Sequence, residues 1–234
     1  MEHQIIYSVE QEKGLNRFVA RTFLWMMIGL AISTLSAYML LKTKVLFYHI
    51  VSNSFFYYGI FMIEIMLAYS LRINLEKIEN KISYIVKFIV YSILTGVTFA
   101  VVGALYEPMS IVYALVSTIP LFAMLAIYGY TTNRDLTKIG TIARPIMIGL
   151  IISILMNGLL FKSNFIELMI SIVVLLTFSG LTAYDMQKIK AVYLYFENQP
   201  HVHNSLIVSC ALELYLDFIN MFISVLNIFG KLKD

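Results

Sequence analysis

Residues 22–41 read TFLWMMIGLAISTLSAYMLL, and none of these side chains is charged. A helix that crosses the hydrocarbon core of a bilayer needs about 20 mostly apolar residues. The segment has this length, and no small-residue cleavage site follows it, so we interpret it as a retained membrane span and not as a signal peptide. This stretch therefore decides the class of fold, which is that of an integral membrane protein.

The composition of the whole chain agrees with this class. Of its 234 residues, 60% are hydrophobic and 13% are charged, whereas soluble globular domains have about 45–50% apolar and about 25% charged residues. The single cysteine, Cys210, excludes an internal disulfide, a cysteine-ligated zinc site and an iron–sulfur cluster. The net charge of +3 is too small to indicate nucleic-acid binding. A soluble domain, a disordered chain and a disulfide-rich scaffold are excluded.

Six more apolar stretches follow the first, and each is long enough to cross a bilayer as a helix. They are residues 54–71, 82–105, 109–130, 145–161, 165–184 and 205–229. Pro145 opens the fifth stretch, where it fits the first turn of a helix. We therefore predict an all-α membrane protein with seven transmembrane helices and no separate soluble domain. Its parts are a cytoplasmic N-terminal segment (1–21), a seven-helix transmembrane domain (22–230) and a short C-terminal tail (231–234).

The distribution of lysine and arginine predicts the orientation of the chain in the membrane. The N-terminal segment and the loops after the second, fourth and sixth spans hold eleven of these residues, and the opposite side holds five. Cytoplasmic loops of membrane proteins carry the excess of positive charge. We therefore expect a cytoplasmic N-terminus and, because the number of spans is odd, a C-terminus outside.

Polar side chains recur on one face of the last apolar stretch, at spacings of four, three, four and three residues. The five residues are Glu213, Asp217, Asn220, Ser224 and Asn227. On a helix this spacing places all of them on the same face. A polar stripe of this length cannot face lipid, so it either lines a cavity or is buried against helices that supply hydrogen-bond partners. Glu64, midway along the second stretch, is a further ionisable residue that a membrane span does not tolerate without a role.

Two aspartates stand out in the last two spans. Asp185 ends the sixth stretch, and Asp217 lies deep within the seventh. Because consecutive spans are antiparallel, the two side chains can meet if they lie at similar depth. Two carboxyl groups within hydrogen-bond distance cannot both ionise cheaply, so they share a proton and respond to pH. When ionised, they offer the hard oxygen ligands that calcium prefers. The sequence thus predicts a pH-sensing pair at Asp185 and Asp217, which is also a candidate metal site.

Three stretches together resemble one known family. Residues 180–190 read GLTAYDMQKIK, residues 214–222 read LYLDFINMF, and residues 128–136 read YGYTTNRDL. They resemble the Bax inhibitor (transmembrane BAX inhibitor motif) family in its bacterial branch, and residues 128–136, 180–190 and 214–222 occur in the family's order along the chain. The resemblance extends over nearly the whole chain and includes its length and its seven-span layout.

The resemblance implies a fold and a function. It implies six helices around a central C-terminal seventh helix and a pH-sensitive calcium leak channel in the bacterial inner membrane, gated by the aspartates that match Asp185 and Asp217. Arg72 matches an arginine that latches onto the aspartate site, and Glu64, Glu213 and Asn220 are candidates to line the pore. Glu213 departs from the family pattern, and an extra carboxylate one turn from Asp217 strengthens the field that attracts cations. The partners so implied are lipid, calcium ions and protons, with no cofactor.

Two other functions compete with conduction. The protein could regulate another membrane protein, such as a membrane-anchored protease, without conducting ions, as is associated with some bacterial relatives. Intramembrane aspartyl proteases also carry a Tyr-Asp pair, which Tyr184 and Asp185 match, but residues 215–217 read YLD and lack the required Gly-x-Gly-Asp. We therefore expect no enzymatic activity.

Overall fold

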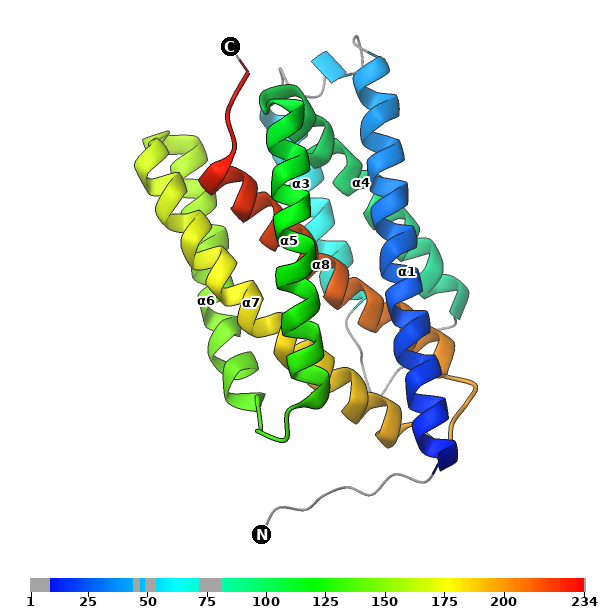
Figure 1. Cartoon of the computed structure of the whole chain (residues 1–234). Helices are drawn as coiled ribbons and strands as arrows, with labels where there is room; N and C mark the ends of the chain where they lie inside the picture. The colour runs from blue at the N-terminus through cyan, green and yellow to red at the C-terminus, as the bar shows by residue number, and fades with distance from the viewer. Residues whose placement is uncertain (1–8, 44–46, 49–53, 72–80, 234) are drawn as a thin grey trace.

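The computed structural model describes residues 9–43, 47–48, 54–71 and 81–233, which form a bundle of long helices (Figure 1). The helices are α1 (Val9–Lys42), α3 (Ser54–Ser70), α4 (Lys81–Leu105), α5 (Pro108–Thr131), α6 (Thr137–Met156), α7 (Asn164–Tyr195) and α8 (His203–Phe229). A π-helical turn, Asn157–Phe161, continues α6. No strand occurs in these described ranges, where an isolated β-bridge joins Tyr106 to Leu232. The prediction of an all-helical chain is confirmed.

Six of these helices are long and apolar enough to cross a membrane. They are α1, α4, α5, α6 with its π-helical turn, α7 and α8. The seventh, α3, is apolar but has only 17 residues. Large apolar side chains project outward from the helices, for example Leu24 and Met27 on α1 and Met124 and Ile127 on α5. In a bilayer these apolar side chains contact lipid tails and are not exposed to water.

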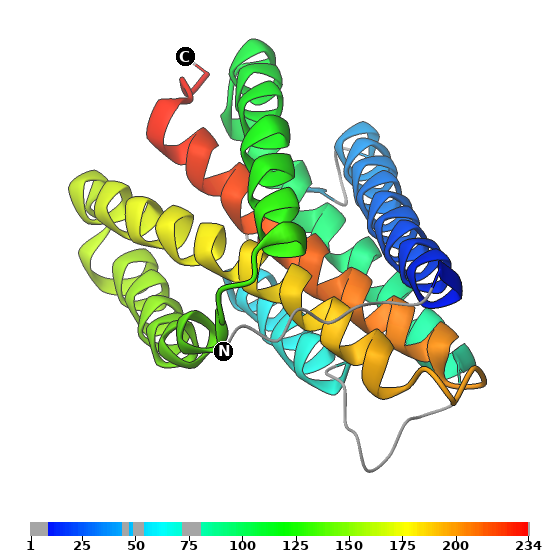
Figure 2. The same cartoon turned by 60° about the horizontal axis from the view of Figure 1, so that its bottom comes forward.

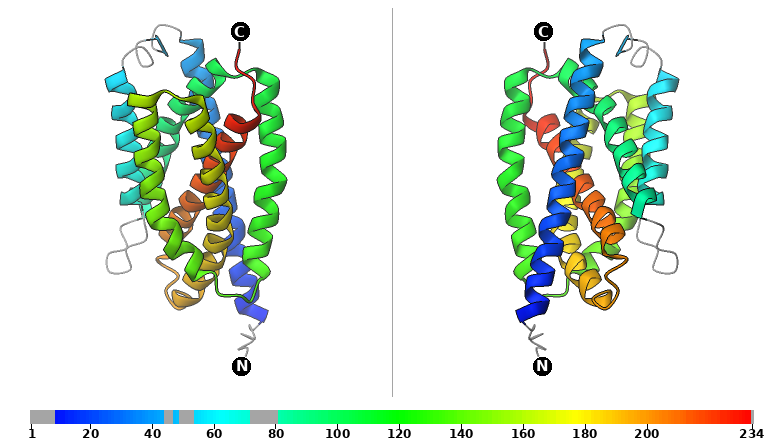
Figure 3. Two further views of the ribbon diagram at one scale, coloured as in Figure 1. Left: turned by 90° about the vertical axis from the view of Figure 1, so that its left-hand side faces the viewer. Right: turned by 90° about the vertical axis from the view of Figure 1, so that its right-hand side faces the viewer.

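Helix α8 is buried far more than the others. In the most apolar 18-residue segment of α8, 78% of the residues are buried. In the corresponding segments of the other candidate spans, at most 33% of the residues are buried. It packs against α1, α4, α5 and α7. Figure 1 shows α8 running obliquely behind α1 and α5, and both views of Figure 3 show it passing between helices on either side. Polar groups on any face of α8 therefore lie against other helices and away from lipid.

Helices α5 and α7 touch backbone to backbone at a glycine. A Cβ atom added to Gly129 of α5 would lie 2.1 Å from the carbonyl oxygen of Ala183 in α7. Small residues at such crossings let membrane helices approach closely, and van der Waals packing then holds them together. Gly129 thus fixes the position of α7 just before Asp185.

Three predicted helix ends are wrong: the end of α7, the start of α6 and the start of α1. Helix α7 continues to Tyr195, so Asp185 lies inside it and not at its end. The helix continues because polar residues after Asp185 find partners in the protein. The Gln187 side chain accepts a hydrogen bond from the backbone N–H of Leu136 and donates one to the carbonyl of Arg134.

The second correction concerns Pro145, which lies inside α6 and not in its first turn. Helix α6 begins at Thr137. The carboxylate of Asp135, two residues earlier, accepts a hydrogen bond from the Thr137 N–H at 2.9 Å. The Thr137 hydroxyl and N–H both hold the pKa of Asp135 below its ordinary value. Membrane helices tolerate an internal proline because neighbouring groups satisfy the freed carbonyl.

Helix α1 begins at Val9 and thus includes much of the segment 1–21 that precedes the first predicted span. Phe18 is buried there, and its ring packs against the rings of Tyr193 in α7 and His203 in α8. The start of α1 therefore belongs to the helical bundle.

The tail after α8 is bonded to the turn between α4 and α5. The Glu107 N–H donates to the Lys231 carbonyl at 2.9 Å, and the Lys231 N–H donates to the Ser110 hydroxyl at 3.0 Å. The Lys233 N–H donates to the Leu105 carbonyl at 2.8 Å. These bonds attach the last turn of the buried helix α8 to α4 and α5.

The contact at Gly129 gives a test of the packing. We expect Gly129→Ala to lower the free energy of unfolding by about 1–3 kcal/mol, because the added methyl group collides with the backbone of α7. Gly149→Ala is the matched control, since a Cβ atom at Gly149 meets nothing within 4 Å, and it should stabilise α6 by about 0.5–1 kcal/mol. Thermal unfolding of both variants in detergent micelles checks this; equal melting temperatures would contradict the close crossing.

Candidate functional site

The interface between α7 and α8 holds a buried cluster of charged side chains. Figure 2 shows the second half of α7 lying beside α8. Asp185 and Lys188 come from α7, and Glu213 and Asp217 come from α8. Asp185 and Asp217 are only 8% and 2% exposed, and the charges of Asp185, Glu213 and Lys188 all act on Asp217. The structure thus brings the two predicted aspartates into one cluster.

Lys188 is the residue that sequence reasoning missed. Its ammonium group forms an ion pair with Glu213, and the two side chains are partly buried, at 30% and 15% exposed. Lys188 follows Asp185 by three residues, a spacing that places both on one face of a helix. This spacing could have identified Lys188, had α7 been predicted to continue beyond Asp185.

The cluster has more negative groups than positive ones. It contains three carboxyl groups and one ammonium group whose charges act on one another, and Glu213 Oε2 and Asp217 Oδ2 are buried without a hydrogen-bond partner. A buried carboxylate that lacks a partner is costly, because it loses its hydration without compensation. The cluster can therefore be balanced by taking up protons or a further cation.

A bound metal ion needs several ligand atoms grouped around one position. Among the residues that the structure describes, no three His, Cys, Asp or Glu side chains are grouped so that they could hold a metal ion. The ammonium group of Lys188 is the cation that the carboxylates face. Calcium at Asp185 and Asp217 stays a prediction.

Glu64 lies in a second buried polar group. It is 7% exposed, and its Oε1 atom has no hydrogen-bond partner. Its neighbours are Thr95 and Tyr91 of α4, and its charge also acts on Tyr215 of α8. The Tyr215 hydroxyl lies 2.5 Å from the hydroxyl of Ser33 in α1. This group therefore lies against the face of α8 that carries Tyr215, whereas the acidic cluster lies against the face that carries Asp217.

The remaining polar stripe of α8 is bonded within the protein. Asn220 donates to the carbonyl of Leu216, and Ser224 donates to the carbonyl of Asn220. Asn227 accepts a hydrogen bond from the Tyr106 hydroxyl at 2.8 Å. Asn220 and Ser224 thus bond to the backbone of α8 itself, and of these three positions burial against partners outside α8 describes Asn227. Arg72, the predicted latch, lies outside the described residues.

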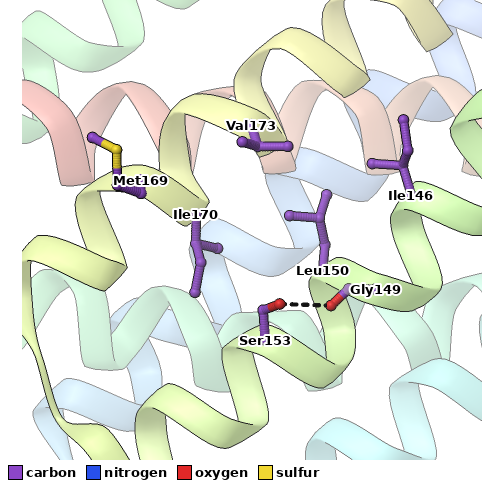
Figure 4. Close-up of a pocket in the computed structure, with 7 residues that line it drawn as sticks. All are labelled: Ile146, Gly149, Leu150, Ser153, Met169, Ile170 and Val173. Atoms are coloured by element: carbon purple, nitrogen blue, oxygen red, sulfur yellow. Dashed lines mark hydrogen bonds between the residues drawn. The ribbon is translucent and has the colours of Figure 1, made fainter.

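A separate hollow of about 340 Å³ lies between α6 and α7 (Figure 4). It is lined by Ile146, Gly149, Leu150, Ser153, Met169, Ile170 and Val173. Its one polar side chain, Ser153, donates to the carbonyl of Gly149. The lining thus offers apolar contact and no group that could bind an ion.

The fold and the buried charges define a polytopic helical membrane protein with an acidic cluster between its last two helices. Residues 15–234 match the family described as "Inhibitor of apoptosis-promoting Bax1". The chain belongs to the Bax inhibitor family, as its resemblance in residues 128–136, 180–190 and 214–222 predicts.

Relatives in bacteria match almost end to end. The chain is 36% identical over 219 residues to an uncharacterized protein of Borreliella burgdorferi, covering 94% of each chain. It is 30% identical over 224 residues to the inner membrane protein YbhL of Escherichia coli K12, covering 95% of each. It is 33% identical over 233 residues to an uncharacterized membrane protein of Streptococcus pyogenes serotype M1, covering 99% of each. The chain is thus similar to bacterial membrane proteins, one of them named for the inner membrane.

The Ser33–Tyr215 contact can be tested on its own. We expect Tyr215→Phe to lower the free energy of unfolding by about 1 kcal/mol, the net contribution of a typical buried hydrogen bond. Tyr113→Phe is the matched control, because Tyr113 is exposed on α5 and should tolerate loss of its hydroxyl. Chemical denaturation in micelles measures both; no difference between the variants would show that the contact adds nothing to stability.

Proposed function

We propose that the protein is a pH-sensitive cation leak pathway, with calcium as the ion, in which Asp185 and Asp217 form the responsive site. The observation that carries the proposal is the burial of both aspartates in one cluster whose negative groups outnumber its positive one. No catalysis is proposed, because residues 215–217 lack the Gly-x-Gly-Asp of intramembrane proteases.

A change in proton occupancy would act on the contact between α7 and α8. When the aspartates lose protons, like charges repel each other across the interface, and in a buried site this repulsion is weakly screened. When they gain protons, the repulsion falls and one carboxyl group can donate a hydrogen bond to the other. The protonation state of the pair thus shifts the position of α8 relative to α7. This shift is the proposed gating movement.

The proposal includes a seven-span arrangement with six helices around α8. In its support, α8 is the most buried span, and 17 residues in α3 reach the lower limit of about 17–25 for a membrane helix. The start of α1 and the end of α8 lie at opposite ends of the bundle (Figure 1). We propose a cytoplasmic N-terminus, from the distribution of lysine and arginine, and the inner membrane as its location, by analogy with YbhL.

Glu64 and Asn220 are proposed to line the pathway, with Arg72 as the latch. The support for Glu64 is a buried carboxylate oxygen without a partner, which could receive an ion or a proton. Asn220 follows Asp217 by three residues on the same face of α8.

Calcium flux into dye-loaded liposomes tests the proposal. We expect wild-type protein to conduct, with a rate that changes with pH, and Asp217→Asn or Asp185→Asn to lose most of the pH dependence because the shared proton site is gone. Glu167→Gln is the control, because it removes an exposed carboxylate in the first turn of α7, 18 residues before Asp185 on the same helix, and should leave the profile unchanged. Equal flux for wild type and Asp217→Asn at every pH would refute the proposal.

A non-conducting regulator is the second candidate. It is favoured by the stripe of α8, since Asn220, Ser224 and Asn227 bond within the protein rather than leaving polar groups free for ions. In this case the aspartates are structural, and the chain binds another membrane protein such as a membrane-anchored protease. Affinity purification from native membranes discriminates: we expect a regulator to retain a stoichiometric partner in Asp217→Asn, whereas a channel copurifies none.

A further inference from the structure

The hollow between α6 and α7 lies between two points where these helices are in close contact. Near the start of α6, a Cβ atom added to Gly140 would lie 2.5 Å from the ring of Tyr184 in α7. At the other end, the Asn157 side chain exchanges two hydrogen bonds with the backbone of Ser163, at 3.1 and 3.2 Å. Between these contacts, a Cβ atom added to Gly149 would meet nothing within 4 Å. The helices are thus fixed at both ends of a gap that they do not fill.

The lining of the hollow favours a hydrocarbon chain over water. Its one polar side chain, Ser153, donates its hydroxyl to the Gly149 carbonyl at 2.8 Å (Figure 4), whereas a bound water needs two to four polar partners. Both helices are candidate membrane spans, and Ile146, Met169 and Val173 of the lining are exposed at the outer surface. In a bilayer the hollow is therefore open to lipid, and an empty gap would lose dispersion contacts.

A lysine lies on the same face of α6 at the depth of a lipid phosphate. Lys138, Ile142, Ile146 and Gly149 follow one another at spacings of four, four and three residues, which places them on one side of a helix. Gly149 comes 11 residues after Lys138, or about 16 Å along the axis at 1.5 Å per residue. Half of the hydrocarbon core is about 15 Å thick. An acyl chain that reaches Gly149 would therefore have its phosphate near Lys138.

The surroundings of Lys138 leave room for a headgroup. Lys138 is exposed and lines a second hollow of about 260 Å³ with Asp135, Thr137, Thr141 and Ile142. The Asp135 carboxylate opposes an anion, but it accepts a hydrogen bond from the Thr137 N–H, and the Thr141 hydroxyl donates to the Thr137 carbonyl. Lys138 is thus the group that attracts a phosphate. Because Asp135 offsets part of this attraction, we expect the acyl chain to contribute most of the affinity.

We propose that the hollow between α6 and α7 is a phospholipid-binding site that takes one acyl chain, with the phosphate of the same lipid at Lys138. The size of the hollow favours lipid over a helix from a second copy of the chain. The hollow measures about 340 Å³, whereas one turn of an α-helix with its side chains, about 10–12 Å wide and 5.4 Å long, takes up roughly 400 Å³ or more. The site is separate from the acidic cluster and does not depend on ion conduction.

Native mass spectrometry of the full-length chain in mild detergent, titrated with phosphatidylglycerol, tests the acyl-chain site. We expect Gly149→Leu to bind the lipid about tenfold more weakly than wild type, because the leucine side chain overfills the hollow once a lipid chain enters. Gly59→Leu is the matched control, since Gly59 of α3 also has open space around its Cβ position, and it should bind as wild type does. Ser153→Leu fills the same hollow if Gly149→Leu folds poorly.

The same titration tests the phosphate position. We expect Lys138→Gln to weaken binding about threefold, as for the loss of an exposed ion pair, and Lys138→Arg to bind as wild type does. Weaker binding in a folded leucine variant together with weaker binding in Lys138→Gln supports the proposal. Unchanged binding in either, or no binding by wild type, overturns it. A wild-type dimer that a leucine variant converts to a monomer also overturns it, because a second copy would then occupy the hollow.

Discussion

The structure depends on one constraint: a polar group that a membrane helix buries is costly unless it finds a partner inside the protein. Helix α8 carries five polar side chains on one face, and α7 supplies partners for the two ends of that face. Near one end Lys188 meets Glu213, and near the other Ser171 accepts a hydrogen bond from Asn227 at 3.3 Å. The long contact between α7 and α8 follows from this matching of polar residues, and the acidic cluster is its most charged part.

Helix α8 separates two polar groups of different character. Its face toward α7 carries ionisable side chains with a net excess of carboxyl groups, whereas Tyr215 faces hydroxyl groups of α1 and α4. Glu64 joins the second group from α3. A displacement of α8 that opens one side would compress the other, so the two groups are mechanically linked through a single rigid helix.

The sequence predicted the fold class and most helix bounds, because a membrane allows few structures other than apolar helices. It failed at Pro145 and after Asp185, where tertiary hydrogen bonds and neighbouring helices, not local composition, decide where a helix ends. Because the predicted helix ended before Asp185, Lys188 fell in a predicted loop. The prediction therefore did not place Lys188 one helical turn from Asp185. The pairing of Lys188 with Glu213 depends on how α7 and α8 align, which no local pattern contains.

The bonded tail has a consequence for how α8 can move. Backbone hydrogen bonds at Lys231 and Lys233 hold the chain just beyond Phe229 to the turn between α4 and α5. The charges at Glu213 and Asp217 lie several turns away from that anchor. A rigid rod fixed near one end tilts about that end when pushed elsewhere and cannot slide along its axis. A movement of α8 in the proposed gating would therefore be a tilt about its anchored C-terminal end and not a slide along its axis.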